Sequence, residues 1–393
     1  MSEAIFLIDG PYVSDFLKRT IYELQIPVVK TQEAKALLGE TQTAYLSEEE
    51  AVLKLKKSPD TKIYTNSENS LVWIYTRHPN RELVDKLLST KDKVLFRKKL
   101  ERINPDFYYR ELSSNEFEKL DPDLIPFPVI VKPAVGFFSL GVHGVQSQGD
   151  WRDTIAGIKS TIQQTNELYP AAVLDNTKYI IEEVIDGDEF AIDCYYDNSG
   201  TPVVLNIMKH LFASDNDVND RVYISSGNIV GEYLERITNY LNSLGEIFRL
   251  KDFPAHVELR ITETGLINVI EINPLRFGGW CSTPDLAKYA WDINVYEYVY
   301  KSLVPEWGNI IKKKKGSVYA LVVLNNSTGV SGSQIKSFNY DLLLRKIETP
   351  QELRKTDFSK YPLFGFLMCE VKESDLSSLY ELLHSDLSEY IEV

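Results

Sequence analysis

The chain has 393 residues, of which 44% are hydrophobic and 25% charged, and its net charge is -14. This composition is ordinary for a globular protein and excludes wholesale disorder. Since domains usually hold about 100 to 200 residues, the length predicts about two to four structural units. The negative charge argues against general binding to nucleic acid or to an anionic membrane, because both require a positive surface.

The N-terminus and the cysteines indicate the compartment. No positively charged region precedes the first short apolar run, and no segment approaches the roughly 18 apolar residues of a membrane-spanning helix. Cys194, Cys281 and Cys369 are odd in number and far apart, so we expect reduced thiols rather than disulfides or a zinc cluster. These features predict a soluble, cytoplasmic protein.

The first 90 residues alternate between strand and helix patterns. Ala4–Ile8 is apolar, a helical pattern follows through Leu24, and Ile26–Val29 is again β-prone. Ser47 and Glu50 have the spacing of a capping box, which predicts a helix start. We expect a small α/β unit with a mostly parallel sheet. No glycine-rich phosphate loop follows its first strand, so we do not assign it a nucleotide site.

The pattern changes after Asp92, a predicted helix N-cap. From Pro128 onward, short paired strands and helices over residues 150–169 and 232–248 predict an α+β arrangement. Lysines occupy positions 312–315, which we interpret as a solvated linker, with an anion-binding patch as the alternative. Beyond them, strands over 317–324 and 364–369 and a helix over 376–383 predict a small C-terminal α+β domain.

Residues 127–145 read FPVIVKPAVGFFSLGVHGV. Lys132 ends a buried strand pattern, and the loop after it contains Gly136, Ser139 and Gly141. Such a loop can fold its amides over phosphate oxygens while a lysine supplies a charge. The alternative for Lys132, and for Lys209 late in the strand pattern of 203–210, is an ordinary surface lysine.

Residues 179–196 read YIIEEVIDGDEFAIDCYY. A β-prone run meets a turn signal at 186–188, and in the next strand Glu189, Ala191 and Asp193 share one face. A connection of this kind between two lobes could place backbone amides against a purine edge, with Glu189 near the ribose hydroxyls. The alternative is an ordinary acidic turn.

Residues 255–279 read AHVELRITETGLINVIEINPLRFGG and predict a β-hairpin. If the hairpin is centred on Thr264 and Gly265, then Glu258 lies directly opposite Glu271, and Asn273 shares their face. Opposed like charges destabilise a hairpin, and two carboxylates with an amide oxygen suit Mg²⁺ that also holds phosphates. The alternative is an exposed hairpin with solvated acids.

Taken in order, VKP, EEVIDGDEF, the lysine strand, HVELR and EINP resemble the ATP-grasp superfamily, particularly its carboxylate-amine and carboxylate-thiol ligases such as D-alanine ligases and biotin carboxylase. The resemblance covers residues 93–294. It implies an α/β pre-ATP-grasp domain over 1–90, an α+β ATP-grasp domain over 91–310 and a small α+β domain over 311–393. The two lobes that clamp ATP would be residues 91–184 and 185–310.

The resemblance also implies roles for individual residues. Lys93, Lys132, Ser139 and Gly141 would contact the ATP phosphates, and Lys209 the γ-phosphate. The nucleoside would meet Glu182, the Glu183–Ile185 backbone and Glu189. Glu258, Glu271 and Asn273 would hold one or two Mg²⁺ ions, with Mn²⁺ able to substitute. Arg276 would steady an acyl phosphate, and His256 stands where some relatives place another basic group.

Two features depart from the family pattern. The phosphate loop is poor in glycine and carries Phe137 and Phe138 at its tip, so it could act as a hydrophobic lid or contact an apolar substrate. Arg276 follows Pro274 by two residues, whereas in many relatives the arginine follows directly. Cys281 invites a catalytic role, but we interpret it as a packed or pocket-lining thiol.

The implied function is an ADP-forming ligase that activates a small carboxylate as an acyl phosphate and couples it to an amino-acid-like amine. The alternatives are an enzyme that sends the acyl phosphate to a thiol or another acceptor, and a non-catalytic ATP-binding protein. Homodimerisation is a further expectation from the resemblance.

Overall fold

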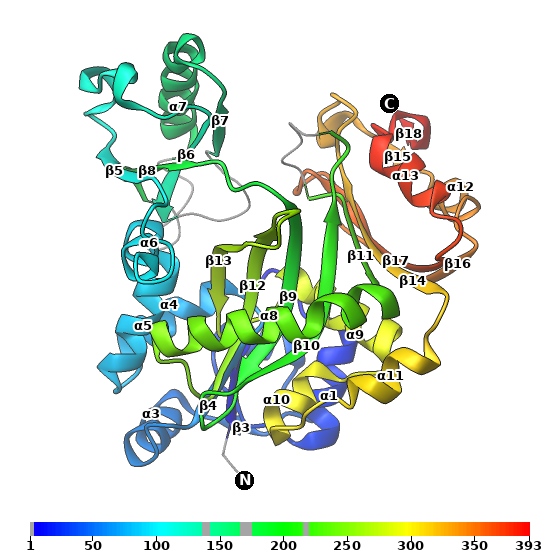
Figure 1. Cartoon of the computed structure of the whole chain (residues 1–393). Helices are drawn as coiled ribbons and strands as arrows, with labels where there is room; N and C mark the ends of the chain where they lie inside the picture. Colours follow the sequence, from blue (N-terminus) through cyan, green and yellow to red (C-terminus); the bar gives the residue numbers. More distant parts are fainter. Residues whose placement is uncertain (1–3, 136–141, 166–174, 215–219) are drawn as a thin grey trace.

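The computed structural model describes residues 4–135, 142–165, 175–214 and 220–393. The N-terminal unit is a parallel sheet in the order β3-β2-β1-β4, covered by helices (Figure 1). Its strands are β1 Ala4–Leu7, β2 Val28–Val29, β3 Tyr45–Leu46 and β4 Lys62–Thr65. Its helices are α1 Asp15–Leu24, α2 Gln32–Leu38, α3 Glu48–Lys57, α4 Leu71–Arg77 and α5 Arg81–Lys91. The predicted parallel α/β unit and the Ser47–Glu50 capping box of α3 are confirmed.

A second unit is a separate four-stranded sheet in the order β5-β8-β6-β7 (Figure 1). Its elements are α6 Lys93–Leu100, β5 Tyr109–Ser113, β6 Val129–Val135, β7 His143–Val145, α7 Trp151–Thr165 and β8 Asp175–Glu183. The Asp92 side chain accepts hydrogen bonds from the first turn of α6, as its predicted N-cap role requires. This unit has its own core, in which Phe117, Trp151 and Ile181 are buried.

The central layer is an antiparallel sheet in the order β13-β12-β9-β10-β11-β14-β17-β16. Its first five strands in sequence are β9 Asp188–Tyr196, β10 Pro202–Leu211, β11 Val222–Ser226, β12 Phe253–Ile261 and β13 Ile267–Pro274. Helix α8 (Gly227–Phe248) covers one face, where the ring of Phe190 meets that of Tyr233. The opposite face carries Glu189, Ala191 and Asp193, and packs near α9 (Ser282–Trp291). α10 Val295–Lys301 and α11 Trp307–Lys313 follow.

The C-terminal segment extends this same sheet. β14 (Ser317–Asn325) pairs with β11, and β17 (Leu363–Lys372) and β16 (Thr349–Lys355) follow in the sheet. α12 Tyr340–Leu344, α13 Ser377–His384 and the pair β15 Ser337–Phe338 and β18 Ile391–Glu392 cover them around a second hydrophobic cluster. The predicted α+β content is present here, but its strands continue the sheet of the preceding residues.

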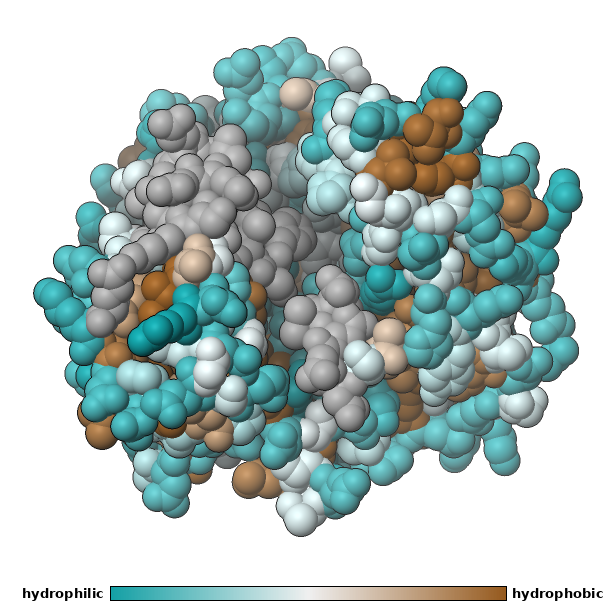
Figure 2. Space-filling model, turned by 90° about the horizontal axis from the view of Figure 1, so that it is seen from above, coloured by the Kyte–Doolittle hydropathy of each residue, from teal (hydrophilic) through white to brown (hydrophobic). Residues whose placement is uncertain are grey.

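The surface is that expected of a chain in which 25% of the residues are charged. Seen from above, the molecule is mostly hydrophilic, with apolar residues in local patches (Figure 2). Among the helices that the structure describes, none is long and apolar enough to cross a membrane.

Candidate active site

The hairpin of β12 and β13 has the predicted register. Glu258 pairs directly with Glu271, and His256 pairs with Asn273. The turn closes at Gly265, whose φ is +88°, a conformation that glycine adopts at little cost. The ladder shifts by one residue just beyond Glu258, so the carboxylate pair lies next to a β-bulge.

The neighbouring strand β9 extends this pairing into a polar patch on one face of the sheet. Side chains directly opposite in neighbouring strands stand side by side on the same face. The rows across β9, β12 and β13 are Ala191, Glu258 and Glu271, then Asp193, His256 and Asn273, with Glu189 and Arg260 forming a further pair.

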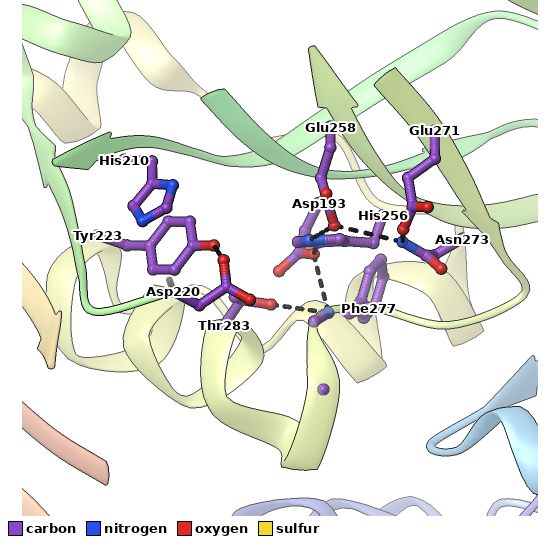
Figure 3. Close-up of polar contacts among 12 residues, drawn as sticks. Asp193, His210, Asp220, Tyr223, His256, Glu258, Glu271, Asn273, Phe277 and Thr283 are labelled. Carbon is purple, nitrogen blue, oxygen red and sulfur yellow. Dashed lines mark hydrogen bonds and ion pairs between the residues drawn. The ribbon is translucent and has the colours of Figure 1, made fainter. Parts of the chain in front are cut away.

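The two carboxylates are bridged by one amide. Asn273 Nδ2 donates to Glu271 Oε1 at 2.7 Å and to Glu258 Oε1 at 3.4 Å (Figure 3). Lys93 Nζ lies 3.8 Å from Glu271 Oε2. Burial raises the pKa of Glu258 to about 7, with the charge of Glu271 adding to it. Burial acts in the same direction on Glu271, but Lys93 and Lys91 hold its pKa below the usual value. The pair therefore has room for further positive charge beside Glu258.

Arg276 approaches the pair from the loop after β13. Its Nη2 donates to Asn273 Oδ1 at 2.9 Å and to Glu68 Oε1 at 2.5 Å, and its Nη1 donates to the carbonyl of Phe277 at 2.8 Å. Lys91 reaches the other oxygen of Glu68 at 2.9 Å. Burial would raise the pKa of Glu68, but the charges of Lys91 and Arg276 lower it to about 2. The N-terminal unit thus orients the arginine through an ionised carboxylate.

His256 stands beside Glu258 on β12. Its Nδ1 lies 2.7 Å from Asp193 Oδ1, and its Nε2 lies 3.6 Å from Glu258 Oε1 (Figure 3). Burial would lower the pKa of His256, but the hydrogen bonds and charges of Asp193 and Glu258 raise it to about 9. The imidazolium is therefore a source of positive charge at this end of the carboxylate pair.

A second charged cluster joins the small sheet to the central one. The Glu182 carboxylate, on β8, contacts Lys132 of β6 and accepts from Arg97 Nε of α6 at 2.9 Å. Arg97 Nη1 also donates to the carbonyl of Val269 at 2.7 Å. Burial would raise the pKa of Glu182, but Arg97 and Lys132 lower it to about 2. This cluster places Lys132 where the two sheets meet.

A third cluster surrounds Glu189. Its carboxylate lies 3.1 Å from His210 Nδ1 and accepts from Arg260 Nε at 3.0 Å. Arg260 also donates to the carbonyl of Ile185 at 2.7 Å, in the connection between β8 and β9. Burial would raise the pKa of Glu189, but His210 and Arg260 lower it.

The predicted site residues thus fall into three neighbouring clusters. Those around the carboxylate pair are Lys93, His256, Glu258, Glu271, Asn273 and Arg276. Lys132 and Glu182 form the second cluster, and Glu183 accepts from the Tyr108 amide at 3.1 Å close by. Lys209 is 2.6 Å from Asp188, and in the part of the chain that the structure describes no contact joins it to the carboxylate pair. Ser139 and Gly141, with Phe137 and Phe138, lie outside the described residues.

Five residues in these contacts were not predicted from the sequence: Glu68, Lys91, Arg97, His210 and Arg260. A signal existed for Arg97, because it lies four residues after Lys93 on one helix and so shares its face. For Glu68 none existed, since its partner Arg276 is 208 residues away. Cys281 is buried, and burial raises the pKa of its thiol to about 11, which supports the interpretation as a packed residue.

The donor set suits magnesium bound together with phosphates. Across residues 4–135, 142–165, 175–214 and 220–393, no group of three or more His, Cys, Asp or Glu side chains could hold a metal by itself. The carboxylates of Glu258 and Glu271 stand next to each other, while the Asn273 amide presents its nitrogen to them and its oxygen to Arg276. Mg²⁺ is commonly held by one or two carboxylates with substrate phosphates and water completing its shell. The residues therefore fit Mg²⁺ carried by a nucleotide.

Comparison with known proteins gives the same fold. Residues 125–284 match the family model of the ATP-grasp domain, and no curated protein matches the sequence. The structure resembles an L-amino acid ligase from Bacillus licheniformis, with a TM-score of 0.68, 16% identity and coverage of 99% of this chain and 98% of that chain.

Two other solved structures agree. N5-carboxyaminoimidazole ribonucleotide synthetase from Thermotoga maritima has a TM-score of 0.60, 15% identity and coverage of 99% of both chains. Biotin carboxylase from Campylobacter jejuni has a TM-score of 0.60, 13% identity and coverage of 94% of this chain and 87% of that chain. The chain therefore carries an ATP-grasp domain at residues 125–284, within an ATP-grasp fold that extends over nearly its whole length.

Proposed function

We propose that the protein is an ADP-forming ligase that uses Mg-ATP to activate a carboxylate as an acyl phosphate and couples it to an amine. The observation that carries this proposal is the carboxylate pair Glu258 and Glu271 with Asn273 between them and Arg276 and Lys93 at its edge. Charges arranged in this way can bind a metal ion, the phosphate groups of the nucleotide and an anionic intermediate in one place.

The chemistry explains why lysines and an arginine dominate the site. A carboxylate is a poor acyl donor because its leaving group would be oxide, so the γ-phosphoryl group of ATP is first transferred to it. The amine then attacks the acyl carbon and expels phosphate. In the first step the protein chiefly positions the reactants and neutralises charge, so no covalent enzyme nucleophile is required.

In this proposal Glu258 and Glu271 hold the metal, and Asn273 joins them when its amide oxygen turns from Arg276 toward the ion. Bound Mg²⁺ would neutralise the phosphate oxygens and align the γ-phosphoryl group for transfer. Burial raises the pKa of Glu258 to about 7 although His256 lies 3.6 Å away, so Glu258 is the less compensated carboxylate, which supports a cation there. One or two ions, and replacement by Mn²⁺, are both compatible with this donor set.

Arg276 would bind the oxygens of the acyl phosphate. Its hydrogen bonds to Glu68, Phe277 and Asn273 fix the plane of the guanidinium, so little side-chain entropy remains to be lost on binding. Lys93, 3.8 Å from Glu271, would contact the same phosphates, and Lys132 would contact others from the small sheet. Lys209 pairs with Phe190 on the face that α8 covers, so it stays apart from these groups.

The nucleoside would lie along the connection between β8 and β9. The backbone from Glu183 to Ile185 offers donors and acceptors to an adenine edge, and Glu189 offers a carboxylate to the ribose. Arg260 supports this assignment, because it holds both the Ile185 carbonyl and the Glu189 carboxylate and so gives the connection one conformation.

The test is release of ADP from the purified protein with Mg-ATP and a library of small acids and amines, supplied singly and in pairs. Turnover that requires a pair supports the amine ligase and identifies both substrates. Turnover with an acid and a thiol, or with an acid alone, supports another acceptor. ATP binding without turnover for any pair points to a non-catalytic role.

Matched variants assign the activity to this site. Glu271→Gln removes one charge of the pair, and Glu263→Gln removes one charge from the exposed turn of the same hairpin. We expect turnover to fall at least about 100-fold in the first and to stay within about twofold of wild type in the second. Equal activity in all three proteins would contradict the proposal.

A homodimer in the cytoplasm stays a prediction, and sedimentation would measure the oligomeric state.

A further inference from the structure

We propose that Asp193 is a positioning residue that joins the two halves of the site, setting His256 against Glu258 and holding the backbone that follows Arg276. This role rests on the proposed function, since it concerns the same metal and phosphate site. Asp193 lies in the middle of β9, and its side chain has no exposed surface.

The first half of the role concerns the orientation of His256. Asp193 Oδ1 also accepts from the Gly278 amide, so we take it as the acceptor in the 2.7 Å contact, with the proton on His256 Nδ1. The other ring nitrogen, Nε2, then faces Glu258 Oε1 at 3.6 Å. In metal sites a carboxylate commonly orients an imidazole by accepting its second ring proton, and ligating carboxylates are themselves held by neighbouring groups. Glu258 is in this way held by a chain of contacts that begins at Asp193.

The second half concerns the loop after β13. The amide of Gly278 donates to Asp193 Oδ1 at 3.3 Å and to Thr283 Oγ1 at 2.9 Å. A Cβ on Gly278 would lie 2.3 Å from Thr283 Oγ1, so this close approach requires glycine. Arg276, two residues earlier, also donates to the carbonyl of the intervening Phe277. Asp193 therefore helps to fix the segment that carries the arginine.

Burial indicates that Asp193 does more than brace a loop. Its second oxygen, Oδ2, is buried and has no hydrogen-bond partner among the described residues. An uncompensated carboxylate oxygen in a sheet interior is costly, and an asparagine could accept the same two hydrogen bonds without a charge. The carboxylate is therefore kept at a cost to folding, which its 2.7 Å contact with His256 explains better than its longer 3.3 Å bond from Gly278.

The first experiment measures the contact without nucleotide or metal. A proton shared between an imidazole and a buried carboxylate resonates far downfield of the amides in the proton NMR spectrum. We expect such a resonance in wild type and its loss in Asp193→Ala and His256→Gln. Tyr196→Phe is the matched control, because it removes a buried 2.9 Å hydrogen bond from the same strand without touching His256 or Gly278. Absence of the resonance in wild type would overturn the proposal.

The second experiment measures positioning by the affinity for ADP with and without Mg²⁺. Loss of an outer-shell partner typically costs about 10- to 100-fold in metal affinity, so the gain in ADP affinity from Mg²⁺ should fall by that factor in Asp193→Ala. Asp193→Asn, which keeps an acceptor and serves if the alanine variant does not fold, should lose less, and Tyr196→Phe should match wild type. A folded Asp193→Ala protein with an unchanged gain would overturn this role alone. If wild type itself gains nothing from Mg²⁺, the proposed function and this role fall together.

Discussion

Glu258 and Glu271 are next to each other on adjacent strands, and few partners in the fold compensate their charges. Like charges directly opposite in a β-ladder destabilise it by up to about 1 kcal/mol. The fold reduces this cost with the Asn273 amide, Lys93 and His256 and keeps the carboxylates in place. A cost of this kind is expected where a residue serves binding rather than folding.

Replacing one of these carboxylates should therefore separate stability from activity. We expect Glu258→Gln to unfold within about 1 kcal/mol of wild type in EDTA, because the repulsion from Glu271 and the attraction of His256 are lost together. ADP release should meanwhile fall by about 100-fold or more. A clear loss of stability with full activity would show that Glu258 is only a structural residue.

Gly187 lies in the connection between the lobes, where the backbone has a conformation that favours glycine. Its φ is +108°, and a Cβ there would lie 2.3 Å from the carbonyl oxygen of Ile261. We expect Gly187→Ala to destabilise the protein by about 1 to 3 kcal/mol and to weaken ATP binding, because the backbone must move away from β12. Gly39→Ala is the control, since Gly39 also has a positive φ, +76°, but open space around it. Urea unfolding and ATP titration of both variants test this prediction, and equal effects would contradict it.

At the scale of elements, the small sheet is tied to the central sheet by one helix and one ion cluster. Helix α6 presents Lys93 to β13 and Arg97 to both Glu182 and the β13 backbone. Strand β6 brings Lys132 to the same carboxylate from the other side. The relative placement of the two lobes therefore depends on the buried Glu182 carboxylate, whose charge Arg97 and Lys132 compensate.

The pH dependence of stability should report this cluster. The folded pKa of Glu182 is about 2, below the usual value of 4.5, so its contribution is fully present above pH 4.5 and is lost as the pH falls toward 2. A shift of this size corresponds to at most about 3 kcal/mol. Urea unfolding between pH 7 and pH 3 should show a shallower acid loss in Glu182→Gln than in wild type.

A surface pair on the same sheet provides the control for that measurement. Glu111 lies 3.3 Å from Lys178, and both side chains are about half exposed. Exposed pairs contribute at most about 1 kcal/mol, so Glu111→Gln should follow the wild-type pH profile. Identical profiles for all three proteins would show that the Glu182 cluster adds no stability.

At the scale of the whole molecule, three distant segments meet at one buried ion pair. Arg354 of β16 donates to Asp285 of α9 at 2.5 Å and to the carbonyl of Trp280 at 2.5 Å. Asp285 also accepts from Ser14, the N-cap of α1, at 3.1 Å. The C-terminal strands, the central unit and the N-terminal unit are thereby connected close to the loop that carries Arg276.

Breaking this pair should destabilise the whole chain. Removing one partner of a buried ion pair typically costs about 3 to 5 kcal/mol, because the other charge stays buried and unpaired. We expect that loss in Arg354→Met, and a smaller loss when Asp285→Asn is added, since both buried charges are then gone and only the partly exposed Glu352 has lost its contact with Arg354. Thermal unfolding of the two single variants and the double variant measures the coupling. Additive losses would show that the two charges do not interact.

The sequence by itself determined the local elements and the hairpin register. Side-chain alternation places Glu258, Glu271 and Asn273 on one face, and glycine at position 265 closes the turn, because neighbouring residues set both features. The capping residues Ser47 and Asp92 mark helix starts for the same reason. The order of the short motifs along the chain also indicated the ATP-grasp fold correctly.

Only the tertiary structure decided how these elements combine. The continuation of the central sheet into β14, the contact of Glu68 with Arg276 and the Glu182 cluster join residues far apart in sequence. Local periodicity specifies which side of a strand is polar but not which strand lies beside it. Strand order and ion partners follow from burying the whole set of apolar faces at once, a global condition that no single segment of the sequence expresses.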